Sequence, residues 1–283
     1  MTPTRLVRFV VYALLVFFAV LTLIPFAYLL AGALKSRFDF AASLFLPHGE
    51  GWLGIGWDRI TLANFRRLLF ELPVPRAMLN SMFIASVHSV VAALLCSMGG
   101  YALAKLKFPG RSLIIGIVLT ALIIPGPLLL APSFQLLYQL GLLDTYAGLL
   151  LPGLTPAFGI FLFRQAMLRG VPDELIEAAR IDGAGEFRIF FELVLPLVRP
   201  MLGAFLLISF LGAWNNFIGP QIILQSPELQ PLSVALNNLR GVYGTDYGLI
   251  MAGTLVSIAP VMCLFLLLQK EFISGLTAGA VKG

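Results

Sequence analysis

One short segment of this chain is rich in acidic residues, which can make directional polar contacts. Six of the fourteen acidic residues lie within residues 173–192, although the chain is 59% hydrophobic and only 12% charged. In that segment Glu177 and Arg180 flank the small residues Ala178 and Ala179. Small side chains let another backbone approach closely, and neighbouring charges can form oriented ion pairs. We therefore predict a water-exposed surface for a protein partner, with a solvated loop that binds nothing as the simpler alternative.

Helix signals surround this surface on both sides. Pro172, Asp173 and Glu174 are typical of a helix start, because proline fits the first turn and acidic groups favour the positive end of the helix dipole. Asp182-Gly183-Ala184-Gly185 predicts the helix end, since glycine adopts left-handed backbone angles at no steric cost. The small-residue surface is thus expected on a helix of about two and a half turns.

A second helix is expected to run from Glu186 to Pro196, and Pro200 is expected to begin a membrane span. The apolar residues of this second helix fall at helical spacing on one face, and an ion pair is expected on another face. The apolar set is Phe187, Phe190, Phe191 and Val194, and the ion pair is Arg188 with Glu192. The segment is therefore predicted to be a helix–turn–helix that lies along a membrane surface.

Side chains suited to catalysis or metal binding are otherwise few. Of the two histidines, His88 lies in an apolar run with no acidic residue in its own predicted helix, and we expect a hydrogen-bonded interior histidine there. Lining of a solute path and catalysis are the alternatives for His88. Cys96 and Cys263 show neither metal-ligand nor redox spacing. Because phosphate-loop, H-E-x-x-H and G-x-S-x-G patterns are missing, we predict no metal site and no enzyme, and any ATP chemistry belongs to another subunit.

The composition indicates an all-α integral membrane protein. The mean hydropathy is +0.94, and soluble domains carry about twice this fraction of charged residues. A bilayer core needs about 20 apolar residues in a helix. Six stretches qualify as transmembrane helices: about 9–32, 80–104, 112–132, 147–167, 200–219 and 248–268.

The distribution of Lys and Arg predicts which ends of the spans face the cytoplasm. With both termini inside, twelve of these residues are cytoplasmic and seven are outside, which follows the positive-inside rule. The net charge of +5 is explained in this way, without a nucleic-acid partner. The first apolar run is longer than that of a cleaved signal peptide, so we predict a retained anchor. Six of the seven outside charges lie in the 33–79 loop, where a short amphipathic helix on the outer membrane surface is expected near 61–69.

Polar residues inside spans are candidates for lining a solute path. Amides and hydroxyls suit a neutral polyol because they donate and accept hydrogen bonds without carrying charge. The candidates are Ser86, His88 and Ser89, then Trp214, Asn215 and Asn216, then Thr254 and Ser257. Trp214 could stack on a sugar face or serve as an interface anchor, and the hydroxyls could bond their own helix instead. The prolines at 125, 127 and 132 indicate either a broken, partly re-entrant third span or a merely kinked one.

The ordered motifs along the chain resemble those of the permease subunits of carbohydrate-uptake ABC importers, the maltose-transporter-type, binding-protein-dependent family. Glu177-Ala178-Ala179, Asp182-Gly183-Ala184 and Leu195-Pro196 resemble the family's EAA signature. A lone Glu-Ala-Ala has no diagnostic value, but the resemblance covers nearly the whole chain. It continues through Asn80-Ser81, Phe108-Pro109-Gly110-Arg111, Ile124-Pro125, Leu140-Gly141-Leu142 with Thr145 and Gly148, Trp214-Asn215-Asn216-Phe217, and the tail from Gly275 to Gly283.

The resemblance implies a fold, partners and roles for particular residues. The fold would be the six-span type I ABC importer permease arrangement with a cytoplasmic EAA coupling helix–turn–helix. Two ATPase subunits would bind ATP and Mg, with no cofactor in this chain. A second permease, an extracytoplasmic solute-binding protein and membrane lipid would complete the partners. Glu177, Ala178, Ala179, Asp182, Gly183 and Ala184 would contact an ATPase, and Gly275, Leu276, Thr277 and Gly279 would reach between the two ATPases unless the tail is simply frayed.

These inferences combine into one expected function. The chain is expected to be the membrane subunit of an ATP-driven sugar or polyol importer in a bacterial or archaeal inner membrane. Residues 1–76 would form an anchor and outer loop, 77–269 the transmembrane domain, and 270–283 a cytoplasmic tail. Trp214, Asn215, Asn216 and Ser257 would line the path. The alternative is an ion-coupled secondary carrier or channel, although no span holds a carboxylate for a proton or sodium site.

Overall fold

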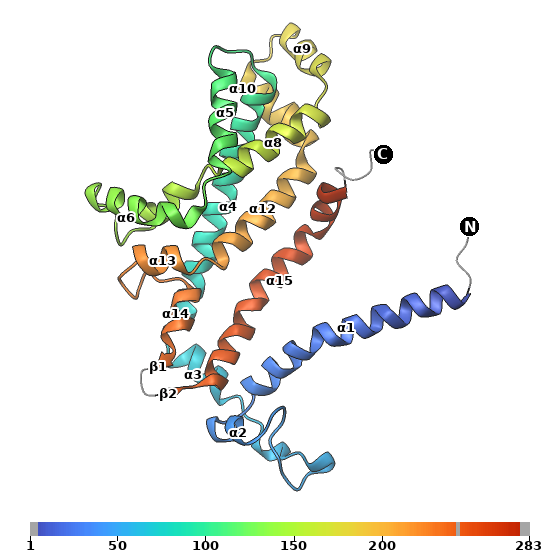
Figure 1. The fold of residues 1–283 in the computed structure, drawn as a ribbon, viewed down its shortest axis with the longest axis vertical. Coiled ribbons are helices and arrows are strands. Elements are labelled where there is room, and N and C mark those ends of the chain that lie inside the picture. The colour runs from blue at the N-terminus through green and yellow to red at the C-terminus, as the bar shows by residue number, and fades with distance from the viewer. Residues whose placement is uncertain (1–4, 242–243, 278–283) are drawn as a thin grey trace. The chain divides into compact units, whose positions relative to one another are not determined.

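A computed structural model describes residues 5–241 and 244–277, which are almost entirely helical (Figure 1). The only strands in these residues form one antiparallel hairpin of β1 (Arg240–Gly241) and β2 (Gly244–Thr245). The helices through the first half are α1 (Arg5–Ala33), α2 (Arg37–Ala42), η1 (Trp52–Gly54), η2 (Trp57–Arg59), α3 (Ala63–Phe70), α4 (Val74–Lys105), α5 (Arg111–Ala121), η3 (Gly126–Leu129) and α6 (Leu130–Gln139). They continue as α7 (Tyr146–Leu150), η4 (Leu151–Gly153), α8 (Ala157–Gly170), α9 (Asp173–Ile181), α10 (Glu186–Arg188), η5 (Ile189–Val194), α11 (Leu195–Leu197), α12 (Arg199–Trp214), α13 (Ile218–Ile223), α14 (Leu232–Asn238) and α15 (Tyr247–Thr277).

Three helices and three bent helix pairs account for the six predicted spans. α1, α4 and α15 are each long and apolar enough to cross a membrane alone. The other three crossings are helix pairs with sharp bends. α5 and the η3–α6 segment meet at 101°, so the proline-rich third span is broken and not merely kinked. The predicted fifth span, 200–219, is wrong at its end because α12 stops at Trp214.

The chain divides into two compact units, which are described separately. The first contains residues 1–75 and 235–259, and the second contains 76–234 and 260–283. The predicted domain boundary after residue 76 lies next to this division. Residues 235–259, which the sequence analysis assigned to the second domain, are grouped with the first unit.

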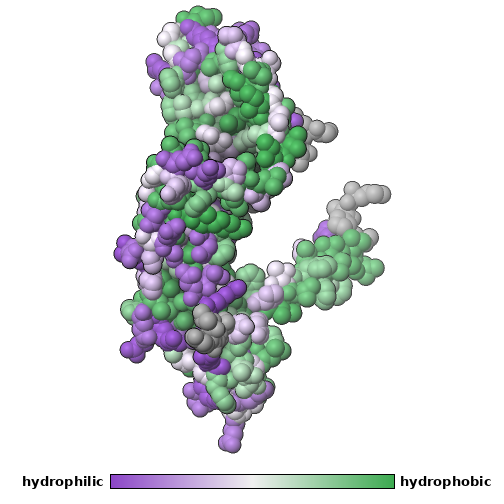
Figure 2. Space-filling model, turned by 60° about the vertical axis from the view of Figure 1, so that its left-hand side comes forward, coloured by the Kyte–Doolittle hydropathy of each residue, from purple (hydrophilic) through white to green (hydrophobic). Residues whose placement is uncertain are grey.

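In the first unit, α1 is apolar and exposed over most of its length (Figure 2). Only its last residues, Ala31 to Ala33, are buried. The helix expected near 61–69 is α3, and its Asn64 donates side-chain hydrogen bonds to the carbonyl oxygens of Ala33 (2.9 Å) and Lys35 (2.8 Å). Leu68 of α3 is fully buried. Protein contacts therefore anchor α3 to the end of α1.

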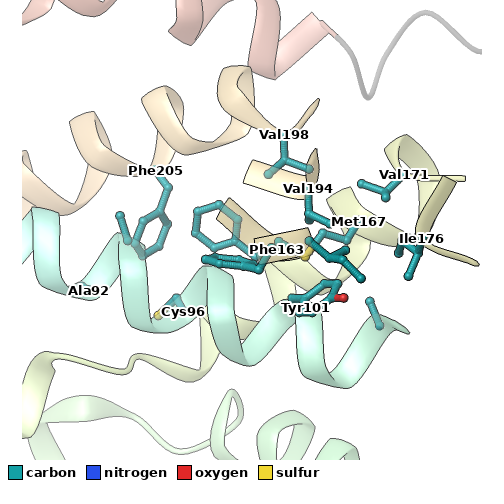
Figure 3. Packing of buried hydrophobic residues seen from close by; sticks show 14 residues of the cluster. Ala92, Cys96, Tyr101, Phe163, Met167, Val171, Ile176, Val194, Val198 and Phe205 are labelled. Atoms are coloured by element: carbon teal, nitrogen blue, oxygen red, sulfur yellow. The ribbon is translucent and has the colours of Figure 1, made fainter. Parts of the chain in front are cut away.

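The core of the second unit joins membrane helices to the polar segment. Side chains from α4, α8, η5 and α12 form one buried cluster that also includes Ile176 of α9 (Figure 3). At its centre Phe163 of α8 meets Phe205 of α12 edge to face, with ring centroids 5.2 Å apart. Such aromatic pairs contribute about 0.5–1.5 kcal/mol beyond the area that they bury. The polar segment is thus attached to the membrane helices through packed side chains.

Two adjacent glycines of α4 provide a test of this packing. A Cβ at Gly100 would lie 2.6 Å from the Cβ of Phe163 and 2.8 Å from the backbone nitrogen of Arg164, whereas one at Gly99 would meet only Ile160 at 3.6 Å. Overpacking costs about 1–3 kcal/mol. Gly100→Ala is therefore expected to lower the Tm of the detergent-purified protein by at least about 3 °C, and Gly99→Ala to leave it unchanged. Equal Tm values for the two variants would contradict the close approach of α4 and α8.

Candidate functional site

The first helix of the polar segment has the predicted limits. α9 follows Pro172 and ends at Asp182, and Gly183 has a left-handed φ of +80°. The N–H of Gly183 donates to the carbonyl of Arg180 (3.0 Å), and the N–H of Ala184 donates to that of Ala179 (2.9 Å). This pair of bonds is the Schellman motif, which satisfies carbonyl groups at a helix end. Gly183 therefore sets the direction in which the chain leaves α9.

The outward face of α9 contains only one of the two alanines predicted for it. Ala178 and Glu177 are exposed, but Ala179 packs partly against the buried cluster beside Ile176. Two apolar residues that the sequence analysis missed, Leu175 and Ile181, are 43% and 86% exposed. Their spacing of i, i+3 and i+6 around Ala178 was the available signal. The exposed surface is thus apolar, with Glu177 on its border.

A buried lysine ties the start of α9 to the end of α4. Lys105, the last residue of α4, donates from Nζ to the carbonyl of Val171 and to the carboxylate of Asp173, both at 2.6 Å. The side chain of Lys105 is only 5% exposed, whereas that of Asp173 is 74% exposed. The Lys105 ammonium holds the pKa of Asp173 below its usual value, by hydrogen bonding first and by charge second. The sequence analysis assigned no role to Lys105.

Further polar bonds brace the turn after α9. Arg180 donates from Nε to Glu186 at 2.7 Å, across the Gly183 turn. Tyr101 of α4 donates its hydroxyl to the other carboxylate oxygen of Glu186 at 2.6 Å. Beside these residues a hollow of about 700 Å³ has Lys107, Arg111 and Glu177 on its walls. Both helices of the segment are therefore bonded to α4, and charged groups line the hollow beside them.

The second helix differs from its prediction in the face that it buries. α10 continues into a π-helical turn, η5, in which Ile189, Phe190 and Val194 are buried. Phe187 and Phe191 are 71% and 46% exposed, so the predicted apolar face is wrong at these two positions. A π-helical turn has i→i+5 hydrogen bonds and rotates the side chains away from the α-helical pattern. The ion pair of Arg188 with Glu192 is confirmed, at 2.9 Å.

Proline also acts differently from the expectation at the end of this helix. Pro196 lies inside α11, and the helix ends one residue later, at Leu197. The chain then bends by 83° into α12 around Val198. Pro196 cannot donate a backbone hydrogen bond, and a π-helical turn before a proline relieves the clash with the preceding turn.

The four candidates for a solute path lie in different surroundings. Trp214 is 6% exposed and stacks on Phe210 with centroids 5.6 Å apart, and Asn215 donates its side-chain amide to the carbonyl of Leu211. Ser257 donates its hydroxyl to the carbonyl of Thr254 at 2.7 Å, within its own helix. Asn216 alone of the four lines a cavity of about 200 Å³ in the second unit. A role in solute passage stays a prediction for all four.

His88 lies on the wall of the same cavity. Within the described part of the chain its imidazole makes no hydrogen bond, so the hydrogen bond expected for this histidine is not made to this chain. The position of His88 on a cavity wall agrees with the alternative of lining a solute path, which stays a prediction.

The tail candidates lie at and beyond the limit of the structure. Gly275, Leu276 and Thr277 form the end of α15. Gly279 lies outside the described residues.

The sequence of the chain is similar to those of membrane transport proteins. The family model described as "Binding-protein-dependent transport system inner membrane component" matches residues 2–270. The arabinooligosaccharides transport system permease protein AraQ of Halalkalibacterium halodurans is 43% identical over 204 residues, 72% of this chain and 73% of AraQ. The lactose transport system permease protein LacG of Rhizobium radiobacter is 30% identical over 98% of this chain and 97% of LacG. A chain of a bacterial ABC transporter involved in import of the acidic polysaccharide alginate shares the fold, with a TM-score of 0.81, 24% identity and coverage of 96% and 100%.

Proposed function

Because the chain belongs to the family of binding-protein-dependent transport system inner membrane components, we propose that it imports a sugar or related polyol as one membrane subunit of an ATP-driven transporter. Like its permease relatives, it is an inner-membrane transport subunit and not an enzyme. The family match does not favour an ion-coupled carrier or a channel.

One observation carries the proposed mechanism: α9 presents an exposed apolar surface while its other face belongs to the core of the membrane helices. Ala178 and Ile181 face outward, and Ile176 packs inward with side chains from α4, α8 and α12. A rigid helix with both faces engaged transmits displacement, because packed cores do not deform continuously. A partner bound to the outward face can therefore move the membrane helices.

The partners that fit this surface are two ATPase subunits that bind ATP and Mg. We assign Glu177, Ala178, Ala179, Asp182, Gly183 and Ala184 to the contact with one of them. Ala179 and Gly183 support this contact indirectly, through the packing of α9 and the turn that ends it. Closure of the ATPases on ATP would draw α9 along and open the path to the other side. Such coupling needs the ATPase to bind the two conformations of this chain with different affinity.

The remaining partners and the orientation follow from the same proposal. A second permease completes the path, and an extracytoplasmic solute-binding protein delivers the solute. Both termini are cytoplasmic, and Gly275, Leu276, Thr277 and Gly279 reach between the two ATPases. The relatives transport arabinooligosaccharides and lactose by name, which supports a sugar substrate.

The proposal is tested by affinity purification of the tagged chain from its native membrane after gentle solubilisation. We expect a phosphate-loop ATPase and a second six-span permease to copurify in a ratio of about 2:1 to one another, as mass spectrometry would quantify. Glu177→Lys is expected to lose at least about nine-tenths of the ATPase and to keep the permease, because it places a cation where a basic partner residue binds. Glu50→Lys, the same reversal at an exposed position in the predicted outer loop, is the control. A chain that purifies alone after mild crosslinking would overturn the proposal.

A further inference from the structure

The cavity that His88 and Asn216 share is a built polar site inside a membrane protein. Its walls come from four parts of the second unit, α4, the α7–η4 segment, the end of α12 and α13, and from Asn216 in the loop between the last two. Its volume of about 200 Å³ corresponds to roughly six or seven water molecules. This is the size of a single sugar ring and too small for an oligosaccharide.

Both polar side chains on the wall have hydrogen-bonding capacity to spare. Within the described residues the His88 imidazole makes no hydrogen bond. The Oδ1 atom of Asn216 accepts from the N–H of Gly219 at 3.3 Å, while its Nδ2 group donates to nothing in the described chain. An imidazole donates from one nitrogen and accepts at the other, and a carboxamide donates two hydrogens. Together they can satisfy the donors and acceptors of vicinal hydroxyl groups.

Backbone groups contact both residues. A Cβ at Gly153 would lie 3.0 Å from the Cε1 atom of His88, so the glycine lets the η4 backbone support the imidazole. Asn216 is held by the Gly219 bond and by its own carbonyl, which accepts from the hydroxyl of Ser233 at 2.8 Å. Polar groups that are held in place bind a ligand without a large entropic cost.

The wall also defines the charge of the ligand. No Asp, Glu, Lys or Arg is among the described residues that line the cavity. The remaining wall is apolar, with Ile84, Leu149 and Leu150, which suits the carbon face of a sugar ring. A carboxylate would lose its hydration there without gaining a counter-ion.

We propose that this chain binds one neutral sugar ring in the cavity through the His88 imidazole and the Asn216 carboxamide. The proposal rests on the proposed function and deepens it, because it places a solute subsite within this subunit. His88 lies 17 residues before Lys105, or about 25 Å along α4 at 1.5 Å per residue, which puts the subsite in the outer half of the span if Lys105 is at the cytoplasmic face.

The two histidines of the chain allow a direct test. The assembled complex in nanodiscs is treated with diethyl pyrocarbonate, and carbethoxylation of His88 and His48 is followed by mass spectrometry. The probes are lactose, melibiose and trehalose, with galacturonate as the charged control. We expect a transported sugar to slow modification of His88 at least about fivefold and to leave that of His48, in the exposed outer loop, unchanged. Unchanged modification of His88, or equal protection by galacturonate, would overturn the subsite.

Uptake by proteoliposomes separates this inference from the proposed function. We expect His88→Leu to raise the KM for the transported sugar at least about tenfold, and His88→Gln, which keeps a donor and an acceptor, to stay within about threefold. Wild-type KM in His88→Leu, together with active sugar uptake, would refute the subsite and leave the proposed function intact. A wild-type complex that takes up no sugar from a broad panel would refute the proposed function and the subsite with it.

Discussion

Gly183→Val is expected to reduce solute uptake at least about tenfold while the chain reaches the membrane in normal amount. Gly183 has a φ of +80°, and a side chain there costs about 1–2 kcal/mol, with β-branched residues at the upper end. A Cβ at this position would meet no atom within 4 Å, so the whole effect arises from the backbone. A shift of 1–2 kcal/mol changes a two-state population by a factor of about 5–30. The equilibrium constant for forming the Schellman turn, and hence for aligning α9 with its partner, would fall by that factor.

Gly185 supplies a matched control for this result. It lies two residues away and also has open space around its Cβ position, but its φ of −73° suits valine. Uptake and ATP hydrolysis are compared for both variants in proteoliposomes that contain the assembled complex. We expect Gly185→Val to behave like the wild type, and Gly183→Asn to be intermediate because asparagine tolerates left-handed angles. Equal activity of Gly183→Val and Gly185→Val would show that the turn conformation does not matter for coupling.

The limits of α9 could be predicted because single residues determine them. Pro172 and Gly183 have backbone preferences that hold in almost any surroundings, and the structure confirms both ends. The six spans were also visible, since hydropathy depends on composition alone. The directions of the helices within each bent span could not be predicted in this way. The bends of 101° and 83° depend on how neighbouring helices pack, and hydropathy contains no information about direction.

The faces of the polar segment were harder to predict than its limits. Ala178 and Ala179 are chemically identical, and only the position of the buried cluster decides that Ala179 packs inward. The π-helical turn at η5 exposed Phe187, which α-helical spacing had placed inside. For His88 the sequence left lining of a solute path as one alternative, and it could not identify the cavity because the other wall residues are far away in the sequence. Each of these errors concerns a contact between distant parts of the chain.

Lys105 makes the clearest contact of this kind. It bonds to Val171 and Asp173, which lie 66 and 68 positions further along the chain. Its two bonds are unequal in strength. Asp173 is 74% exposed, so solvent screens the ion pair, and exposed pairs contribute only about 0–1 kcal/mol. The bond to the buried Val171 carbonyl is protected from water, and hydrogen bonds to charged groups contribute about 1.5–3 kcal/mol. The carbonyl bond is therefore expected to be the stronger mechanical link between α4 and α9.

Lys105→Met should separate ATP hydrolysis from transport. The methionine fills most of the buried volume but removes the donor to Val171, while the outward face of α9 stays intact for the ATPase. We expect the ATPase to copurify as usual and the number of solute molecules imported per ATP hydrolysed to fall at least about fivefold, measured in the same proteoliposomes. Lys107→Met, at an exposed position two residues away, is the control and should have no effect. Asp173→Asn should lower this ratio less than twofold, and a loss as large as that of Lys105→Met would mean that the ion pair, and not the carbonyl bond, connects the two helices.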